Sequence, residues 1–440
     1  MDLSSAPDPA ALKAFLAFVR RQSPYYREIW RDVPENALLE FYPVTNLTDY
    51  WEAARKDDAA SLLTGRHESG LVIRSGGTSD KPKVVRVTYQ ENDASSLRLA
   101  SFMRMLRIGS DDKIANLFYV GNMYYSFLGI HDALLSLREA INLPISGNMP
   151  AEAIEPLLVE HKPTVLMTTL SVASKLAAVM KKRGRQPMSS VRLILYGGEG
   201  LYEDQIAPLH EAFPRATLQM LAYGAMDGGT IAFQLGNLVS VQQQHERERD
   251  VYSVNWPETV VELVDDDNKP VTTPGVEGRI LVTNLVHRLM PFVRYPVGDR
   301  ASWVDPKRGL FRLLGRDKSV GVRLSGNSMT YIDIRRAVTT ALRCAELGHQ
   351  LEGLQVVIER PEAVDRMRLR VAGDFGGVSP HVAMAAIHAA VITLNPPFEM
   401  HLREGLVGPI VVEFCNTAEL ECSPLSGKVI EVLDRRLLAH

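Results

Sequence analysis

The chain has 440 residues, of which 46% are hydrophobic and 23% are charged, and its formal net charge is −3. This composition is typical of a globular enzyme that can bury more than one core, and the small net charge argues against nucleic acid or an anionic membrane as a partner. No segment approaches the roughly 18 apolar residues that span a bilayer, residues 1–8 lack the regions of a signal peptide, and the three cysteines are too few for a disulfide framework. We therefore expect a cytoplasmic protein.

Helices and strands are predicted to alternate along the first half of the chain. Residues 9–31 are predicted to be a helix, because apolar residues such as Phe15 and Val19 recur on one face. Further on, strands are expected at 114–118, 164–168, 191–196 and 217–223, and helices at 91–106, 171–182 and 202–213. This alternation predicts an α/β sheet with helices on its faces, whose ligands lie beyond the carboxyl ends of the strands.

The second half begins with closely spaced strands and ends with a compact α+β stretch. Strands are expected at 259–264, 279–283, 291–295, 319–324, 354–358, 367–371 and 409–414, with helices from residue 331 and at 380–394. The change of pattern predicts a domain boundary, with an N-terminal domain at 1–316 and a C-terminal domain at 317–440.

A loop between two short apolar runs has the composition of a phosphate-binding loop. It reads Ser75-Gly-Gly-Thr-Ser-Asp-Lys-Pro-Lys83, and it offers backbone N–H groups, hydroxyls and lysines to an anion. It is not a Walker A loop, because the G-x-x-x-x-G-K-[ST] spacing is missing and a strand is expected to follow. The candidate phosphate-binding residues are Ser75, Gly76, Gly77, Thr78, Ser79, Lys81 and Lys83.

Eight short segments resemble, in the same order, the motifs of the phenylacetate–CoA ligase branch of the acyl-adenylate-forming enzymes. They are the loop at 75–83, Leu128-Gly-Ile-His131, Tyr196-Gly-Gly-Glu199, Tyr223-Gly-Ala-Met-Asp227, Arg294-Tyr-Pro-Val-Gly-Asp299, Leu314-Gly-Arg-Asp-Lys318, Ser325-Gly-Asn327 and Ser426-Gly-Lys428. The likeness covers nearly the whole chain from about residue 10. It implies an α/β fold with a large N-terminal domain of several subdomains and a small, mobile α+β C-terminal domain.

The resemblance also implies ATP and Mg²⁺ as cofactors and a role for individual residues. Lys428 would bridge the substrate carboxylate and the α-phosphate as the catalytic residue, Asp227 would hold Mg²⁺, and Lys318 would be the hinge between the domains. The remaining nucleotide-binding residues would be Gly198, Glu199, Gly200, Tyr223 and Gly224 around the base, and Asp299 and Arg316 at the ribose.

The implied reaction activates an aromatic carboxylic acid as its acyl-adenylate and transfers the acyl group to a thiol, most simply that of coenzyme A. The acid pocket would be formed by Tyr124, Tyr125, Phe127, His131, Gly197 and Ala222. Two other acceptors stay open, namely the phosphopantetheine of a carrier protein and an amine, as in secondary metabolism. The oligomeric state is also open, with a homodimer among the options.

Four departures from the family pattern keep a different class of function open. Asp80 stands where the family has glycine, Asp227 stands for glutamate, and Met226 and Val297 each stand for threonine. All four lie on the metal and phosphate side of the implied site, where charge and hydroxyl groups matter most. A weakly active descendant that binds an acyl-adenylate without turnover is therefore the alternative.

Some of these residues have an equally good structural interpretation. Glu199, His131 and Asn327 can be structural hydrogen-bonding residues, and the aromatic run that contains Tyr124 can belong to a core. The cysteines are interpreted as structural.

Overall fold

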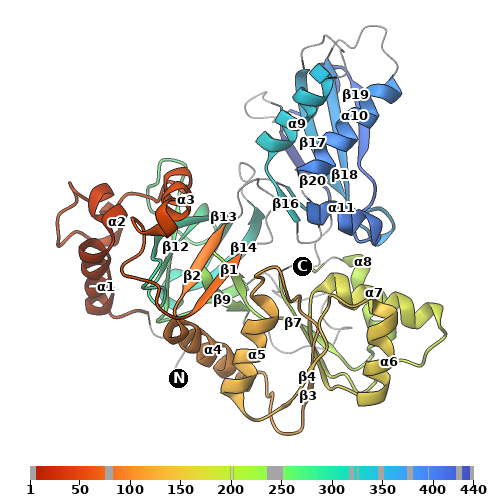
Figure 1. The fold of residues 1–440 in the computed structure, drawn as a ribbon, viewed down its shortest axis with the longest axis horizontal. Coiled ribbons are helices and arrows are strands. Elements are labelled where there is room, and N and C mark those ends of the chain that lie inside the picture. Colours follow the sequence, from red (N-terminus) through yellow and green to blue (C-terminus); the bar gives the residue numbers. More distant parts are fainter. Residues whose placement is uncertain are drawn as a thin grey trace.

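The computed structural model describes residues 6–74, 83–198, 200–201, 203–234, 251–316, 322–324, 327–344, 351–373, 380–394, 396–422 and 429–436. Within these residues the chain forms two lobes, each with a hydrophobic core of its own. The cores of the large lobe draw on residues from Phe15 to Phe311, and the core of the small lobe on residues from Val322 to Val412. The small lobe is drawn in cyan and blue in Figure 1. The expected fold class is confirmed.

The predicted helix at 9–31 is two helices, α1 (Pro9–Gln22) and α2 (Pro24–Ile29). The chain breaks at Ser23, which has φ −89° and ψ 118° and caps α2, because the residue before a proline is pushed out of the helical region. Together with α3 (Leu47–Arg55) and the short 3₁₀ turns Leu39–Phe41 and Asp57–Ala59, these helices form the N-terminal end of the large lobe (Figure 1).

The large lobe contains the expected parallel sheet, with helices on both faces. Its strands follow the order β4-β3-β5-β6-β7, and every neighbouring pair is parallel. The strands are β3 (Lys113–Asn116), β4 (Ile141–Pro144), β5 (Val165–Thr168), β6 (Leu193–Tyr196) and β7 (Thr217–Met220). One face is covered by α4 (Tyr89–Met105) and α5 (Ser126–Leu137), and the other by α6 (Ala151–His161), α7 (Leu170–Lys182) and α8 (Glu203–Ala212).

A second, antiparallel sheet follows directly. Its strand order is β11-β12-β13-β14-β10-β9-β8. The strands are β8 (Tyr223–Ala225), β9 (Gly229–Gln234), β10 (Val251–Val254), β11 (Thr259–Val264), β12 (Glu277–Asn284), β13 (Phe292–Asp305) and β14 (Leu310–Arg316). The single strand expected at 217–223 is therefore divided between the two sheets, so Tyr223 begins the second sheet just beyond the carboxyl end of β7. A separate hairpin of β1 (Leu71–Arg74) and β2 (Val84–Val87) flanks residues 75–83.

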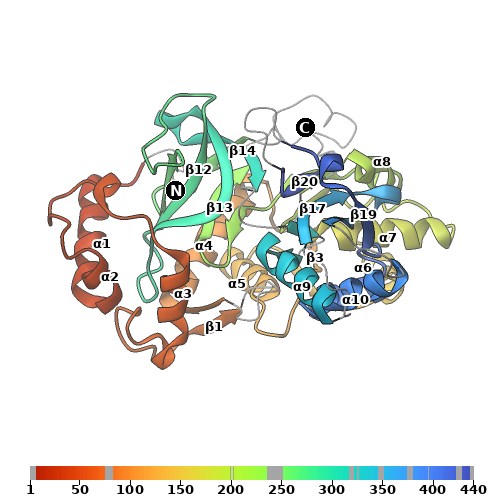
Figure 2. The same cartoon turned by 90° about the horizontal axis from the view of Figure 1, so that it is seen from above.

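The small lobe is an α+β unit, as expected. It contains β15 (Val322–Leu324), β16 (Asn327–Met329), α9 (Tyr331–Cys344), β17 (Leu351–Glu359), β18 (Arg366–Gly373), α10 (Pro380–Thr393), α11 (Pro396–Arg403), β19 (Val411–Cys415) and β20 (Val432–Asp434). Its sheet has the order β19-β18-β17-β20, and α9 and α10 lie side by side (Figures 1 and 2). None of the helices in the described part of the chain has the length and apolar character needed to span a membrane.

Candidate active site

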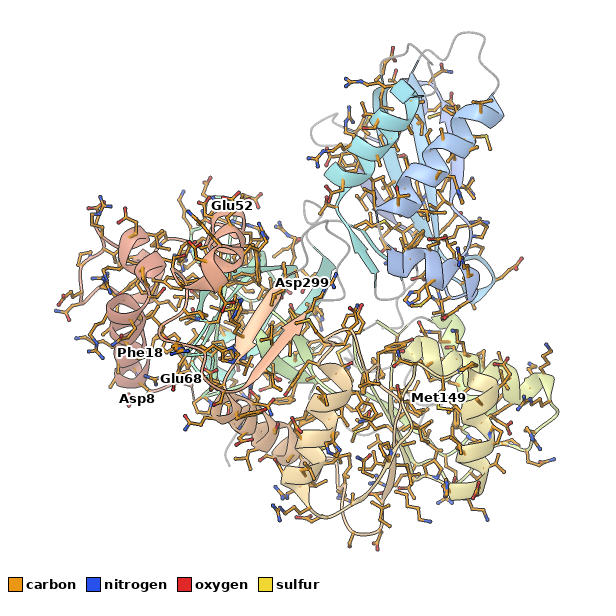
Figure 3. All side chains as sticks on the ribbon, viewed as in Figure 1. Asp8, Phe18, Glu52, Glu68, Met149 and Asp299 are labelled. Carbon is orange, nitrogen blue, oxygen red and sulfur yellow. The ribbon has the colours of Figure 1, made fainter. Side chains whose placement is uncertain are left out.

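One part of the site is a contact between two of the motifs singled out in the sequence. Tyr223 opens β8, and its ring lies 5.8 Å from that of Tyr252 and 6.1 Å from that of Phe311. Its hydroxyl donates a hydrogen bond to Oδ2 of Asp299 at 2.7 Å. Asp299, labelled in Figure 3, pairs in register with Arg316, the last residue of β14. Three predicted nucleotide-binding residues therefore converge.

The other part is an ion pair between Lys83 and Asp227. Lys83 immediately precedes β2, Asp227 lies in the turn between β8 and β9, and their charged atoms are in direct contact. The hydroxyl of Tyr295 donates to Oδ2 of Asp227 at 2.6 Å and accepts from Nζ of Lys83 at 3.1 Å. Nε1 of Trp51 donates to the same hydroxyl at 3.0 Å. The sequence singled out Lys83 and Asp227 but not Tyr295 or Trp51.

The charge states of this cluster follow from its partners. Burial alone would raise the pKa of Asp227, but the charge of Lys83 and the hydrogen bonds from Lys83 and Tyr295 outweigh it, and the pKa lies below its usual value. Burial, together with the negative charge of Asp227, raises the pKa of Tyr295 well above its usual value. At neutral pH Asp227 is thus a carboxylate and Tyr295 a protonated phenol, and both lie within hydrogen-bonding distance of Lys83.

The turn that carries Asp227 is held by close backbone contacts. A Cβ atom on Gly224 would lie 2.5 Å from the carbonyl oxygen of Gly229, so β8 and β9 approach each other more closely than a side chain would allow. On the other side of the turn, Nδ2 of Asn284 donates to the carbonyl oxygen of Gly228 at 2.9 Å. The position of the Asp227 carboxylate is therefore set by β9 and by the end of β12.

Glycines at the carboxyl end of β6 leave open space next to the site. Gly198 has φ +80°, and no atom lies within 4 Å of the position of a Cβ atom there. Gly197 donates its N–H to the carbonyl oxygen of Thr168 at 3.2 Å. Gly200 and Ala222 are half-buried in the adjoining segments. Small residues at this edge suit a bound planar group, as predicted from the sequence.

The aromatic residues predicted to line the acid pocket have structural contacts of their own. The hydroxyl of Tyr125 donates to Oδ1 of Asn92 at 2.6 Å, and burial together with the charge of Asp132 raises the pKa of Tyr125 to about 12. Phe127 packs against the core between α4, α5 and the parallel sheet. Tyr124 is half-buried in the loop before α5. Their assignment to an acid pocket stays a prediction.

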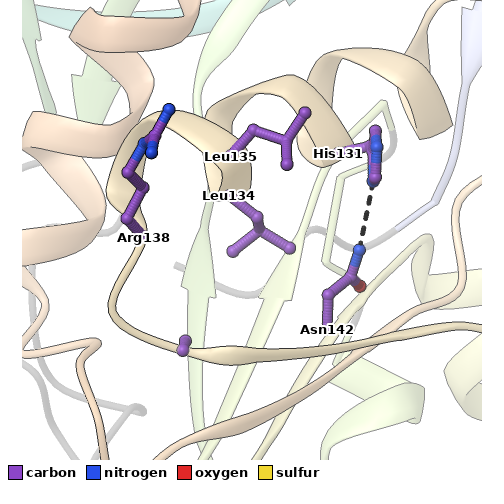
Figure 4. Close-up of a pocket in the computed structure, with 6 residues that line it drawn as sticks. His131, Leu134, Leu135, Arg138 and Asn142 are labelled. Carbon is purple, nitrogen blue, oxygen red and sulfur yellow. Dashed lines mark hydrogen bonds between the residues drawn. The ribbon is translucent and has the colours of Figure 1, made fainter.

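His131 lies on α5, one turn after Phe127, and its side chain faces the edge strand β4. Its Nδ1 is 3.3 Å from Nδ2 of Asn142 on the edge strand β4 (Figure 4). The two side chains line a pocket of about 350 Å³ together with Leu134, Leu135, Arg138 and Ala140. Strands β3 and β5 separate β4 from β6, which carries Gly197 at its end. The structure therefore does not bring His131 together with Gly197.

Several predicted residues lie outside the described part of the chain. These are Ser75, Gly76, Gly77, Thr78, Ser79, Lys81, Glu199, Lys318 and Lys428, and of Arg316 and Asn327 only the backbone is described. Within the described residues, no group of three or more His, Cys, Asp or Glu side chains could hold a metal ion. The single ionised carboxylate of Asp227 nevertheless fits Mg²⁺, which is commonly held by one or two carboxylates together with substrate phosphates and water.

Comparisons with known proteins concern one segment of the chain and its fold. Residues 143–285 match the family model described as AMP-binding enzyme. Among solved structures, 2-hydroxyisobutyryl-CoA ligase in complex with 2-HIB-AMP and CoA is similar with a TM-score of 0.71 and 18% identity, over 97% of this chain and 88% of that one. The amide bond synthetase McbA from Marinactinospora thermotolerans is similar with a TM-score of 0.53 and 17% identity, over 82% and 67%. A comparison with curated proteins finds no match.

The fold is therefore that of the acyl-adenylate-forming enzymes. The matched family segment contains Gly198, Tyr223 and Asp227, and it supports a place for this chain among the AMP-binding enzymes. Structural likeness at this level of identity carries the fold and not the substrate.

Proposed function

We propose that this protein is an AMP-forming ligase that activates an aromatic carboxylic acid as its acyl-adenylate and then transfers the acyl group to the thiol of coenzyme A. The observation that carries the proposal is the convergence of three segments on one site. Tyr223 with Asp299 forms an end suited to a ribose, and Lys83 with Asp227 forms an end suited to phosphates and a metal ion. Strand β13 contributes to both ends through Asp299 and Tyr295.

Each charged group has a specific task in the proposed adenylation. Asp299 accepts hydrogen bonds from the ribose hydroxyls, Lys83 neutralises the phosphates, and Asp227 holds Mg²⁺, which when bound stabilises negative charge on the phosphates. The substrate carboxylate attacks the α-phosphorus of ATP and pyrophosphate leaves. Two anions must meet in this step, so fixed positive charge is the main catalytic requirement. Lys428 supplies it between the carboxylate and the α-phosphate.

The acid and the acceptor are the finer parts of the proposal. An aromatic acid is supported by the resemblance to the phenylacetate–CoA ligase branch, which assigns Tyr124 to the acid pocket. Coenzyme A is preferred over a carrier protein or an amine, and the similar structures include both a CoA ligase and an amide bond synthetase. The second candidate is a weakly active protein that binds acyl-adenylates, which the Met226 and Val297 departures keep open.

A substrate panel tests this proposal directly. Benzoates, phenylacetates, polycyclic aryl acids and octanoate are each supplied with ATP and Mg²⁺, and acid-dependent release of pyrophosphate and AMP is followed. Coenzyme A, a primary amine and a phosphopantetheinylated carrier protein are then compared as acceptors. We expect an aryl acid to be the fastest substrate and coenzyme A the best acceptor. Octanoate activated faster than every aryl acid would contradict the aromatic assignment, and binding without any pyrophosphate release would favour the second candidate.

The role of Lys428 provides an independent test. Replacing Lys428 by alanine should reduce acyl-adenylate formation by several orders of magnitude, because one fixed charge in a desolvated site stabilises the transition state by several kcal/mol, roughly 3–4. AMP binding and thioester formation from pre-made acyl-adenylate should change little. If both half-reactions fall equally, the lysine has a different task.

A further inference from the structure

Two of the motifs share a pattern that their individual roles do not explain. Both read Tyr-x-x-x-Asp, as Tyr223-Gly-Ala-Met-Asp227 and as Tyr295-Pro-Val-Gly-Asp299. The hydroxyl of Tyr223 donates to Asp299 at 2.7 Å, and the hydroxyl of Tyr295 donates to Asp227 at 2.6 Å. Each tyrosine thus binds the aspartate of the opposite segment, so the two segments run past each other in opposite directions with one hydrogen bond at each end.

The side chains near these two hydrogen bonds are closely packed. A Cβ atom on Gly228 would lie 3.5 Å from Cγ1 of Val297, and Val297 belongs to the same core cluster as Tyr223 and Tyr295. Met226 packs against that cluster as well. The two apolar departures from the family pattern, Met226 and Val297, therefore lie in the segments that carry the two hydrogen bonds.

The direction of the hydrogen bond at Tyr295 is fixed by its other partners. An indole N–H and an ammonium group can only donate hydrogen bonds. Because Trp51 and Lys83 both donate to the hydroxyl of Tyr295, its single proton is left for Asp227. The Tyr295 hydroxyl consequently uses its donor and both acceptor positions, and it binds both Lys83 and Asp227, which also contact each other.

We infer that Tyr223 and Tyr295 are reciprocal positioning residues, in which Tyr223 orients the ribose-binding carboxylate of Asp299 and Tyr295 orients the Asp227–Lys83 pair at the phosphates. This inference rests on the proposed function. Because each tyrosine serves one end of the nucleotide, it predicts that loss of one hydroxyl weakens one part of the ligand only. A purely structural role for Tyr295 would weaken AMP and ATP–Mg²⁺ together.

The test uses single hydroxyl deletions in the full-length protein, with calorimetric titration of AMP and of ATP with Mg²⁺. Tyr295→Phe should weaken ATP–Mg²⁺ by about ten- to a hundred-fold, the effect of one lost hydrogen bond to a charged group, and leave AMP within about twofold. Tyr223→Phe should weaken AMP and ATP–Mg²⁺ by a similar factor, because both ligands carry the ribose.

Matched controls come from the same aromatic core. Tyr50→Phe removes a buried hydroxyl that donates to the carbonyl oxygen of Pro291, and Tyr252→Phe removes one that faces Sδ of Met220. Both should leave the affinity for either ligand within about twofold. Trp51→Phe is a second variant, which removes a donor to the Tyr295 hydroxyl, and it should weaken ATP–Mg²⁺ alone by a smaller factor.

The outcomes separate this inference from the proposed function. A parent protein that binds neither AMP nor ATP–Mg²⁺ refutes the proposed function and the inference with it. A parent that binds both, with Tyr295→Phe weakening AMP as much as ATP–Mg²⁺, refutes the inference alone. The inference alone is also refuted if both tyrosine variants bind AMP and ATP–Mg²⁺ as tightly as the parent protein. It is likewise refuted if the control variants lose as much affinity as the tyrosine variants do.

Discussion

His287 is a buried base close to the turn that carries Asp227. It is 7% exposed, and its Nε2 lies 3.4 Å from the position of a Cβ atom on Gly229. Its Nδ1 has no hydrogen-bond partner within the described structure. Burial lowers its pKa, although the nearby carboxylate of Glu91 acts in the opposite direction. The folded state therefore favours the neutral form of His287.

This makes the stability of the protein sensitive to mild acid. Since the pKa of His287 is lower in the folded state than the value of about 6.5 in an unfolded chain, the unfolded state takes up more protons below that pH. We expect a loss of up to about 1.4 kcal/mol of unfolding free energy per pH unit as the pH falls from 6.5 towards the folded-state pKa. Urea unfolding at pH 7.5, 6.5 and 5.5 should show that the unfolding free energy of His287→Gln falls less with decreasing pH than that of the parent protein.

The exposed His161 provides the control, since His161→Gln should follow the parent at every pH. The prediction is wrong if His287→Gln and the parent lose stability at the same rate.

Single residues show where sequence reasoning reached its limit. Lys83, Asp227 and Asp299 were singled out because their motifs resemble those of a family in order, since an aspartate next to a glycine is by itself more often a turn residue. Tyr295 lies inside a quoted motif, but an aromatic residue in a buried strand is ordinarily core, and its function depends on three partners. One of them, Trp51, is 244 residues away. No local pattern encodes such a contact.

The turn between β8 and β9 is the element on which the candidate site depends most. Gly224→Ala would place a methyl group 2.5 Å from the carbonyl oxygen of Gly229, and backbone must move to accommodate it. We expect this to lower the unfolding free energy of the large lobe by about 1–3 kcal/mol and to weaken ATP–Mg²⁺ binding by displacing Asp227. Gly228→Ala is the matched control, because its nearest contact would be an ordinary 3.5 Å.

Thermal unfolding and ATP–Mg²⁺ titration of both alanine variants check the prediction. Equal behaviour of Gly224→Ala and Gly228→Ala would show that the close approach of β8 and β9 is not needed.

Elements were predictable where the sequence shows a short apolar run or a clear amphipathic period, and not where neither signal is present. The strands at 259–264 and the start of α9 at Tyr331 agree with the sequence. By contrast, α5 was not predicted, because it packs between α4 and the parallel sheet and its apolar residues show no clear period. The division between β7 and β8 was also missed, since a continuous apolar run does not reveal that the chain changes sheets.

At the scale of the whole molecule, the two lobes have separate hydrophobic cores. Among the described residues, an ion pair links the two lobes. Nζ of Lys175 on α7 lies 3.7 Å from Oε2 of Glu404, just after α11. A partly exposed ion pair of this length contributes little to stability. Lys318, the predicted hinge between the lobes, lies outside the described residues, and its role stays a prediction.

A proline at the hinge should separate the two half-reactions. Lys318→Pro fixes φ near −65° and restricts rotation of the small lobe. We expect acyl-adenylate formation to persist and thioester formation to fall by at least about tenfold. Lys318→Ala, which removes the charge but keeps the backbone free, should leave both rates near those of the parent. Stopped-flow measurement of each half-reaction decides this, and an equal loss of both in Lys318→Pro would place the hinge elsewhere.

The N-terminal helices bind to strand β13, and this has a consequence for a chain still being made. Hydroxyls of Tyr26 and Tyr50 donate to the carbonyl oxygen of Pro291, 265 and 241 residues further on. At about 5–20 residues per second, a ribosome needs on the order of 10–50 s to supply that partner. Throughout that interval the aromatic residues of α1 to α3 lack their partners in and next to β13. The segment that is synthesised first is thus among the last to reach its place, and the nascent chain carries an apolar surface that chaperones can bind until β13 emerges.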